Sequence, residues 1–119
     1  SLARGGLWFN EGAMSEVIDA ASAVAYSEGS VVSRTVLKRD TGSVTLFAFE
    51  KGEELSEHTA PFEALIHVLD GEAEITVGGV ASRVKTGQMI AMPAGVPHAV
   101  KAVARFKMAL FLASAKAKT

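Results

Sequence analysis

Residues 87–98 read GQMIAMPAGVPH, and this stretch decides the fold. Glycine, proline, glycine and histidine stand in it in the order Gly87, Pro93, Gly95 and His98. Glycine reaches positive φ without strain and proline fixes φ at about −65°, so both residues favour tight turns. The pattern predicts a strand after Gly87, a tight corner at Pro93–Gly95, and a new strand that His98 opens.

A second stretch bounded by glycines lies upstream, at residues 52–71, and reads GEELSEHTAPFEALIHVLDG. We expect His58 to stand at the head of a strand and a further strand to end at Gly71. The acidic residues before His58, which are Glu53, Glu54 and Glu57, are interpreted as a solvated loop.

From Val31 onward the chain predicts one strand after another. Alternation with a period near two is clearest at residues 72–77, where Ala73, Ile75 and Val77 alternate with polar side chains. Asp70-Gly71 and Gly78-Gly79 are both predicted to be tight hairpin turns. Turn signals recur about every eight to twelve residues, which is typical of an antiparallel sandwich or barrel. The fold class is predicted to be all-β, with strands at 31–38, 44–50, 64–69, 72–77, 82–85, 88–92, 98–103 and 106–112.

The first thirty residues are predicted to be an arm and a short helix. Asp19, followed by AASAVAY, is interpreted as an N-cap and one or two helical turns that end near Gly29. Trp8 and Phe9 are the large aromatic groups of the arm, and we expect them to dock against another surface. The expected organisation is one domain, with the arm and helix at 1–30, a β-barrel at 31–113 and a flexible tail at 114–119.

Composition excludes several classes of protein. The chain has 119 residues, which is one domain's worth. It has no cysteine, so disulfides, thiolate catalysis and cysteine-based metal sites are excluded. A net charge of −1 argues against a nucleic acid or an anionic membrane as the main partner. We find no signal peptide pattern at the start, and with the lack of cysteine this favours a cytoplasmic location.

The two glycine-bounded stretches resemble the two motifs of the cupin superfamily. The resemblance covers residues 43–112 and implies a small single-domain cupin with an RmlC-like jelly roll. It also implies a homodimer, for which an outer strand face containing Leu65 and His67 would be suitable.

The resemblance also bears on metal binding. Metal-binding cupins carry two histidines as H-x-H, a glutamate four residues later, and a histidine in the second motif. His58 and His98 match the first and last of these ligands, whereas Ala60 and Ala64 replace the other two. Two imidazoles would hold a divalent ion such as Zn, Fe, Mn or Ni only weakly, since such sites take three or more protein ligands. By strand parity Glu63 and His67 face away from Ala64, so we do not expect them to complete the set.

Three functions follow from these residues as hypotheses. In the first, the protein binds a small molecule inside the barrel, in a pocket lined by His58, His98, Phe62 and Met92. In the second, it is a metal-dependent enzyme of the dioxygenase or isomerase type, with His58 and His98 as metal ligands. In the third, it is a structural dimer or a sensor-like barrel without catalysis. No catalytic residue is identified, and Met89, Met92 and Met108 are interpreted as core filler because Met binds hard metals poorly.

Overall fold

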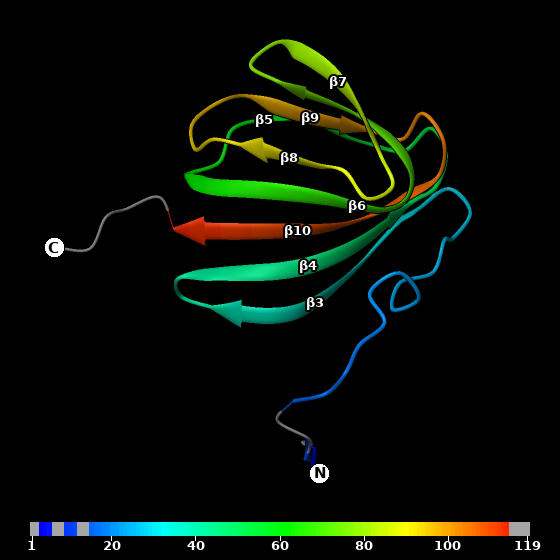
Figure 1. The fold of residues 1–119 in the computed structure, drawn as a ribbon, viewed down its shortest axis with the longest axis vertical. Helices are drawn as coiled ribbons and strands as arrows, with labels where there is room; N and C mark the ends of the chain where they lie inside the picture. The colour runs from blue at the N-terminus through cyan, green and yellow to red at the C-terminus, as the bar shows by residue number, and fades with distance from the viewer. Residues whose placement is uncertain (1–2, 6–8, 12–14, 115–119) are drawn as a thin grey trace, which may run out of the picture.

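The protein is built from strands, as a computed structural model shows for residues 3–5, 9–11 and 15–114 (Figure 1). No helix long and apolar enough to cross a membrane occurs in these ranges. The strands are β1 (Ala3–Gly5), β2 (Phe9–Glu11), β3 (Val31–Arg39), β4 (Gly42–Phe49), β5 (Glu54–His58), β6 (Phe62–Val77), β7 (Val80–Lys85), β8 (Met89–Met92), β9 (His98–Lys101) and β10 (Phe106–Ser114).

The main sheet is antiparallel and curls over itself to form a half-barrel. Its order is β3-β4-β10-β6-β9-β5, and β7 and β8 also pair with β6. The long strand β6 belongs to both layers of the curl, as Figure 1 shows. Its first half pairs with β10 and β8, and its second half pairs with β7 and β9. The predicted all-β jelly-roll class is therefore confirmed.

The predicted hairpin turn at Asp70-Gly71 is wrong. Both residues lie inside β6, at the point where the strand bends from one layer to the other. The register shifts beside this point, between Lys107 and Met108 of β10, which marks a β-bulge. Gly71 has φ +77° and faces the backbone of Arg105, so a side chain there would collide with it. The Asp70-Gly71 dipeptide therefore marks a bend within a strand and not a hairpin turn.

The second predicted hairpin, at Gly78-Gly79, is confirmed. Val77 pairs with Val80, which leaves Gly78 and Gly79 as a two-residue loop. Their φ angles are +58° and +83°, as a type I′ turn requires at both central positions.

The acidic stretch before His58 also differs from its prediction. Glu54–His58 is strand β5 and His58 ends it, so this histidine does not stand at the head of a strand. The strand was missed because it lies at the edge of the sheet, where Glu54 and Glu57 are exposed and only Leu55 is partly buried. His98, by contrast, opens β9 as predicted.

The short helix predicted from Asp19 is absent from the described residues. Only isolated turns occur there, closed by bonds from the Ser22 and Ala23 amides to the carbonyls of Asp19 and Ala20. The Ser22 hydroxyl also donates to the Asp19 carbonyl, and such local bonds compete with helix formation. A segment this short cannot offset the cost of helix nucleation. The expected roles of Trp8 and the Phe9 side chain, and of residues 115–119, lie outside the described part of the chain, whereas Ser114 belongs to β10.

Two apolar clusters hold the sheet together. The inner cluster fills the space between the two layers and contains the fully buried side chains Phe49, Phe106, Ile66, Ile75, Met108 and Val68. The Phe49 and Phe106 rings stack with centroids 4.7 Å apart. The outer cluster forms where residues 20–26 cover the back of the sheet, and Val24 packs there with Leu46, Ala48 and Ala109.

A polar latch fastens the same N-terminal segment to the bend of β6. The Tyr26 hydroxyl donates to Asp70 Oδ2 at 2.6 Å, and the Arg105 guanidinium lies 4.3 Å from the centre of the Tyr26 ring. Arg105 also forms two bonds with the Glu50 carboxylate, and Lys107 Nζ donates to the Ala21 carbonyl. Arg105 and Lys107 are therefore already engaged by groups of the protein.

Candidate functional site

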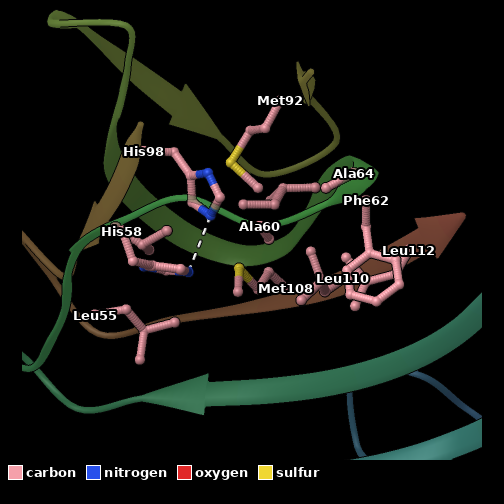
Figure 2. Close-up of a pocket in the computed structure, with 12 residues that line it drawn as sticks. Leu55, His58, Ala60, Phe62, Ala64, Met92, His98, Met108, Leu110 and Leu112 are labelled. Carbon is pink, nitrogen blue, oxygen red and sulfur yellow. Dashed lines mark hydrogen bonds between the residues drawn. The ribbon is translucent and has the colours of Figure 1, made fainter. Parts of the chain in front are cut away.

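The two histidines at the motif positions, His58 and His98, meet inside the curl of the sheet. They stand directly opposite each other on β5 and β9. Their Nε2 atoms are 3.0 Å apart, and the ring planes cross at 68° with centroids 4.2 Å apart (Figure 2). His98 is only 8% exposed, whereas His58 is exposed. The pair therefore connects the interior with the surface.

The backbone fixes which ring nitrogen of each histidine faces its partner. His58 Nδ1 lies 2.8 Å from the Ser56 carbonyl, and His98 Nδ1 lies 3.3 Å from the Val96 carbonyl. A carbonyl oxygen only accepts, so both Nδ1 atoms carry a proton. The two Nε2 atoms then face each other with their lone pairs. Their contact is a hydrogen bond only if one of them also carries a proton, and the pair then holds one positive charge.

The histidine pair is the polar end of an otherwise apolar pocket. The pocket has a volume of about 200 Å³. Among the described residues that line it, the other side chains are all apolar, namely Leu55, Ala60, Phe62, Ala64, Ile66, Met92, Val100, Met108, Leu110 and Leu112. The alternation of side chains along each strand explains the set, since every second residue of β6 and of β10 points inward.

All four residues that the sequence placed at the site line this pocket. Phe62 begins β6 and is 41% exposed, so it stands at the mouth. Met92 ends β8, is 3% exposed and lies beside the His98 ring in Figure 2.

The two alanines at the missing ligand positions also line the pocket. Ala64 lies opposite Met92 on one side and Leu112 on the other. The Ala60 carbonyl accepts a bond from the Gly95 amide at 2.9 Å, which ties the segment after β5 to the Pro93–Gly95 corner. With methyl groups at these positions, space remains beside the histidines.

Glu63 and His67 do not reach this space. The pocket lining includes Ala64 and Ile66 of β6, and the residues of opposite parity lie on the other face of the strand. Within the described residues no group of three His, Cys, Asp or Glu side chains could hold a metal ion. The nitrogen and oxygen donors of the pocket therefore do not fit a tightly held Zn, Fe, Mn or Ni ion.

Sequence reasoning missed Leu55 of β5 and the lining that β10 contributes. Met108, Leu110 and Leu112 lie on one face of β10 together with Phe106, and a period of two in the sequence FKMALFL marks that face. Which face is inside could not be read from the sequence alone, because Phe111 also places a large apolar side chain on the other face of β10.

Comparison with known proteins identifies the family. The family model for the cupin domain matches residues 45–113, and the chain belongs to the cupin superfamily. None of the curated proteins matches the chain.

Solved structures of other cupins share the fold. A conserved protein of unknown function from Streptococcus pyogenes is 38% identical with a TM-score of 0.80, over 86% of this chain and 90% of that one. A cupin 2 conserved barrel domain protein from Leptotrichia buccalis is 41% identical with a TM-score of 0.79, over 82% of this chain and 47% of that one. An RmlC-like cupin from Desulfovibrio desulfuricans is 26% identical with a TM-score of 0.73, over 83% of this chain and 96% of that one.

Proposed function

We propose that this cupin binds a small molecule that has an apolar body and one anionic head, such as a short carboxylic acid. The observation that carries the proposal is the composition of the pocket: among the described residues that line it, His58 and His98 supply the only polar side chains. Pockets of this kind, largely apolar with a few convergent polar groups, are typical of small-molecule sites.

The histidine pair favours a ligand whose polar head group is anionic. A hydrogen bond between the two Nε2 atoms requires one proton beyond those on Nδ1, and with that proton the pair would hold one positive charge next to the almost fully buried His98. No carboxylate is among the described residues that line the pocket. A buried charge without a partner is costly, so a ligand carboxylate that accepts the Nε2–H bond would be favoured over a neutral group.

The volume and the lining of the pocket limit the size and shape of the apolar part of the ligand. A cavity of about 200 Å³ lies below the range of drug-sized pockets, so the ligand is small. The inner walls are mostly aliphatic, and apart from the two imidazoles Phe62 at the mouth is the only aromatic side chain among the described lining residues. A linear or branched aliphatic chain fits this lining better than a flat ring that needs stacking partners.

A thermal-shift series tests this function. Straight-chain carboxylates from butanoate to dodecanoate are compared with the alcohols of the same length. The proposal expects the short carboxylates to raise the melting temperature more than their alcohols, because binding to the native state stabilises it. The absence of any shift across both series would instead favour the structural or sensor-like barrel.

The second candidate is a metal-dependent enzyme of the dioxygenase or isomerase type. One observation favours it: each histidine donates its Nδ1–H to a backbone carbonyl, as metal-ligating histidines do. A weakly held divalent ion would act as a Lewis acid. Turnover that is lost in chelator, restored by the ion and absent in His98→Ala would support this function over simple binding.

We also propose a cytoplasmic homodimer. The outer face of β6, β8 and β10 carries exposed apolar side chains, with Phe111 37% and Met89 54% exposed. Phe111 lies beside Leu65, and Met89 lies beside His67. A second copy covering this face would remove the apolar surface from water. Sedimentation velocity of the wild type and of Phe111→Glu distinguishes a dimer from a monomer.

A further inference from the structure

We propose that the apolar body of the ligand ends in a second anionic group, which Lys38 and Arg39 bind in a recess at the mouth of the pocket. The ligand is then a dicarboxylate with an aliphatic chain between its two ends. We rest this on the proposed function, in which the histidine pair binds the first carboxylate. Three features support it: the wall that the pocket and the recess share, the order of side chains across the sheet, and the charge of the recess.

The recess adjoins the pocket at two side chains. Phe62 and Leu112 line both spaces, and Figure 2 shows them at the end of the pocket away from the histidines. The recess has a volume of about 360 Å³. Its other described lining residues belong to the hairpin of β3 and β4, namely Lys38, Arg39, Asp40, Gly42 and Ser43. A chain that starts at the histidines and passes Phe62 therefore reaches the recess next.

The order of side chains across the sheet continues the inner face of the pocket into the recess. Residues directly opposite each other in an antiparallel pair have their side chains on the same face. Leu112 of β10 pairs with Ala64 on one side and with Ser43 on the other. Ser43 pairs in turn with Lys38 of β3. Because Ala64 and Leu112 line the pocket, Ser43 and Lys38 stand on the same inner face, and the row changes from aliphatic groups to a hydroxyl and then an ammonium group.

The same row indicates the length of the ligand. Strand β3 is three strand intervals from β6, and neighbouring strands are about 4.8 Å apart, so Lys38 lies about 14 Å from Ala64 along the sheet. A short dicarboxylate would leave its second charge among the aliphatic walls, where an unpaired charge is costly. A longer one brings that charge past Phe62 to the recess. The proposal therefore favours dicarboxylates of intermediate length over short ones.

The charge of the recess favours an anion. Within the described residues neither Lys38 nor Arg39 forms an ion pair, and the Lys38 ammonium group makes no hydrogen bond. Arg39 Nη1 donates to the Lys38 carbonyl at 2.8 Å, which leaves the other guanidinium N–H groups available. Asp40 is the one carboxylate among the described lining residues, so two positive side chains stand against one negative. Ammonium and guanidinium groups both bind a carboxylate through charge-assisted hydrogen bonds.

The test is a calorimetric comparison of carboxylates with equal numbers of carbon atoms. Each dicarboxylate from butanedioate to dodecanedioate is titrated beside its monocarboxylate, into the wild type, Lys38→Gln and Lys85→Gln. Both variants lose one positive charge at an exposed position, so both are expected to fold. Lys85 is the matched control, because it ends β7 and is not among the residues that line the pocket or the recess.

We expect the shortest dicarboxylates to bind more weakly than their monocarboxylates, because their second charge stays among aliphatic side chains. With longer chains the order should reverse, and the dicarboxylate should bind about threefold to fivefold more tightly, as an exposed ion pair allows. Lys38→Gln should remove this advantage and added salt should reduce it, whereas Lys85→Gln should keep it.

Two results would overturn the second anionic group and leave the proposed function intact. One is that monocarboxylates bind at least as tightly as dicarboxylates at every length. The other is a dicarboxylate advantage that Lys38→Gln does not change. If neither series binds to the wild type, the proposed function fails together with this proposal.

Discussion

His58 and His98 lie 40 residues apart in the chain, yet they stand directly opposite each other on β5 and β9 with Nε2 atoms 3.0 Å apart. Both rings are held from behind by backbone carbonyls, so the contact is a built feature of the pocket. It places a single hydrogen-bonding centre at one end of a largely aliphatic cavity.

Removing one member of the pair should abolish recognition of an anionic head. His98→Ala is expected to weaken carboxylate binding at least about tenfold, since a charge-assisted hydrogen bond contributes about 1.5–3 kcal/mol. His67→Ala is the matched control, because His67 lies on β6 but is absent from the pocket lining. Titration calorimetry with hexanoate measures both. Equal loss in the two variants would show that the effect is not local to the pocket.

Filling the space beside the histidines should block the ligand without unfolding the protein. Ala64→Leu places a larger side chain in the cavity, and we expect ligand binding to be lost. Ala91→Leu is the control: Ala91 lies on β8, pairs with Leu65 and is exposed. Melting curves with and without hexanoate compare the two variants. A ligand-induced shift that survives in Ala64→Leu would place the ligand elsewhere.

The bend of β6 should depend on Gly71 far more than the hairpin depends on Gly79. Both have positive φ, which costs an alanine about 1–2 kcal/mol. Only at Gly71 would the new Cβ also collide with the Arg105 backbone, which adds about 1–3 kcal/mol, whereas Gly79 has open space. Urea unfolding of Gly71→Ala and Gly79→Ala should therefore show the larger loss at Gly71. Equal losses would mean that the bend can shift to accept a side chain.

The latch at Tyr26 should weaken at both ends of the pH range. Hydrogen bonds from Arg105 hold the pKa of Glu50 below its usual 4.5, so the stability this carboxylate contributes is present above that pH and is lost as the pH falls through the lowered pKa. Burial, together with the bond to Asp70, raises the pKa of Tyr26 above its usual 10.0. Its contribution is therefore complete below pH 10.0 and is lost as the pH rises through the raised pKa.

Thermal melts across the pH range check both ends of this prediction. Glu50→Gln should flatten the loss of stability in acid, and Tyr26→Phe should flatten the loss in alkali. If each variant keeps the wild-type pH profile, the latch does not contribute to stability.

Local signals in the sequence predicted much of this fold. Alternation over residues 72–77 and the Gly78-Gly79 dipeptide placed a strand and its hairpin correctly, because both signals depend on neighbouring residues. The prediction at Asp70-Gly71 was wrong because a glycine with positive φ occurs in strand bends as well as in hairpin turns. Only the pairing of β6 with strands of both layers shows that this glycine lies in a bend. The helix expected after Asp19 failed for a local reason, since the segment is short and the Ser22 hydroxyl bonds to the Asp19 carbonyl.

The pocket was predictable in part. The motif pattern predicted His58 and His98, and Phe62 and Met92 were also predicted to line the pocket; all four line one cavity. The orientation of each imidazole was not predictable, because it depends on the carbonyls of Ser56 and Val96. The position of Met108 in the pocket lining was not predictable either, because it depends on the pairing of β10 with β6.

The most direct test of the proposed function is a calorimetric titration of metal-free protein with hexanoate and, separately, with 1-hexanol, in the wild type and in His98→Ala. The account predicts one hexanoate per chain in the wild type, at least about tenfold weaker binding of hexanol, and no preference for the acid in His98→Ala. Equal affinity for acid and alcohol in the wild type, or no binding of either, would contradict it.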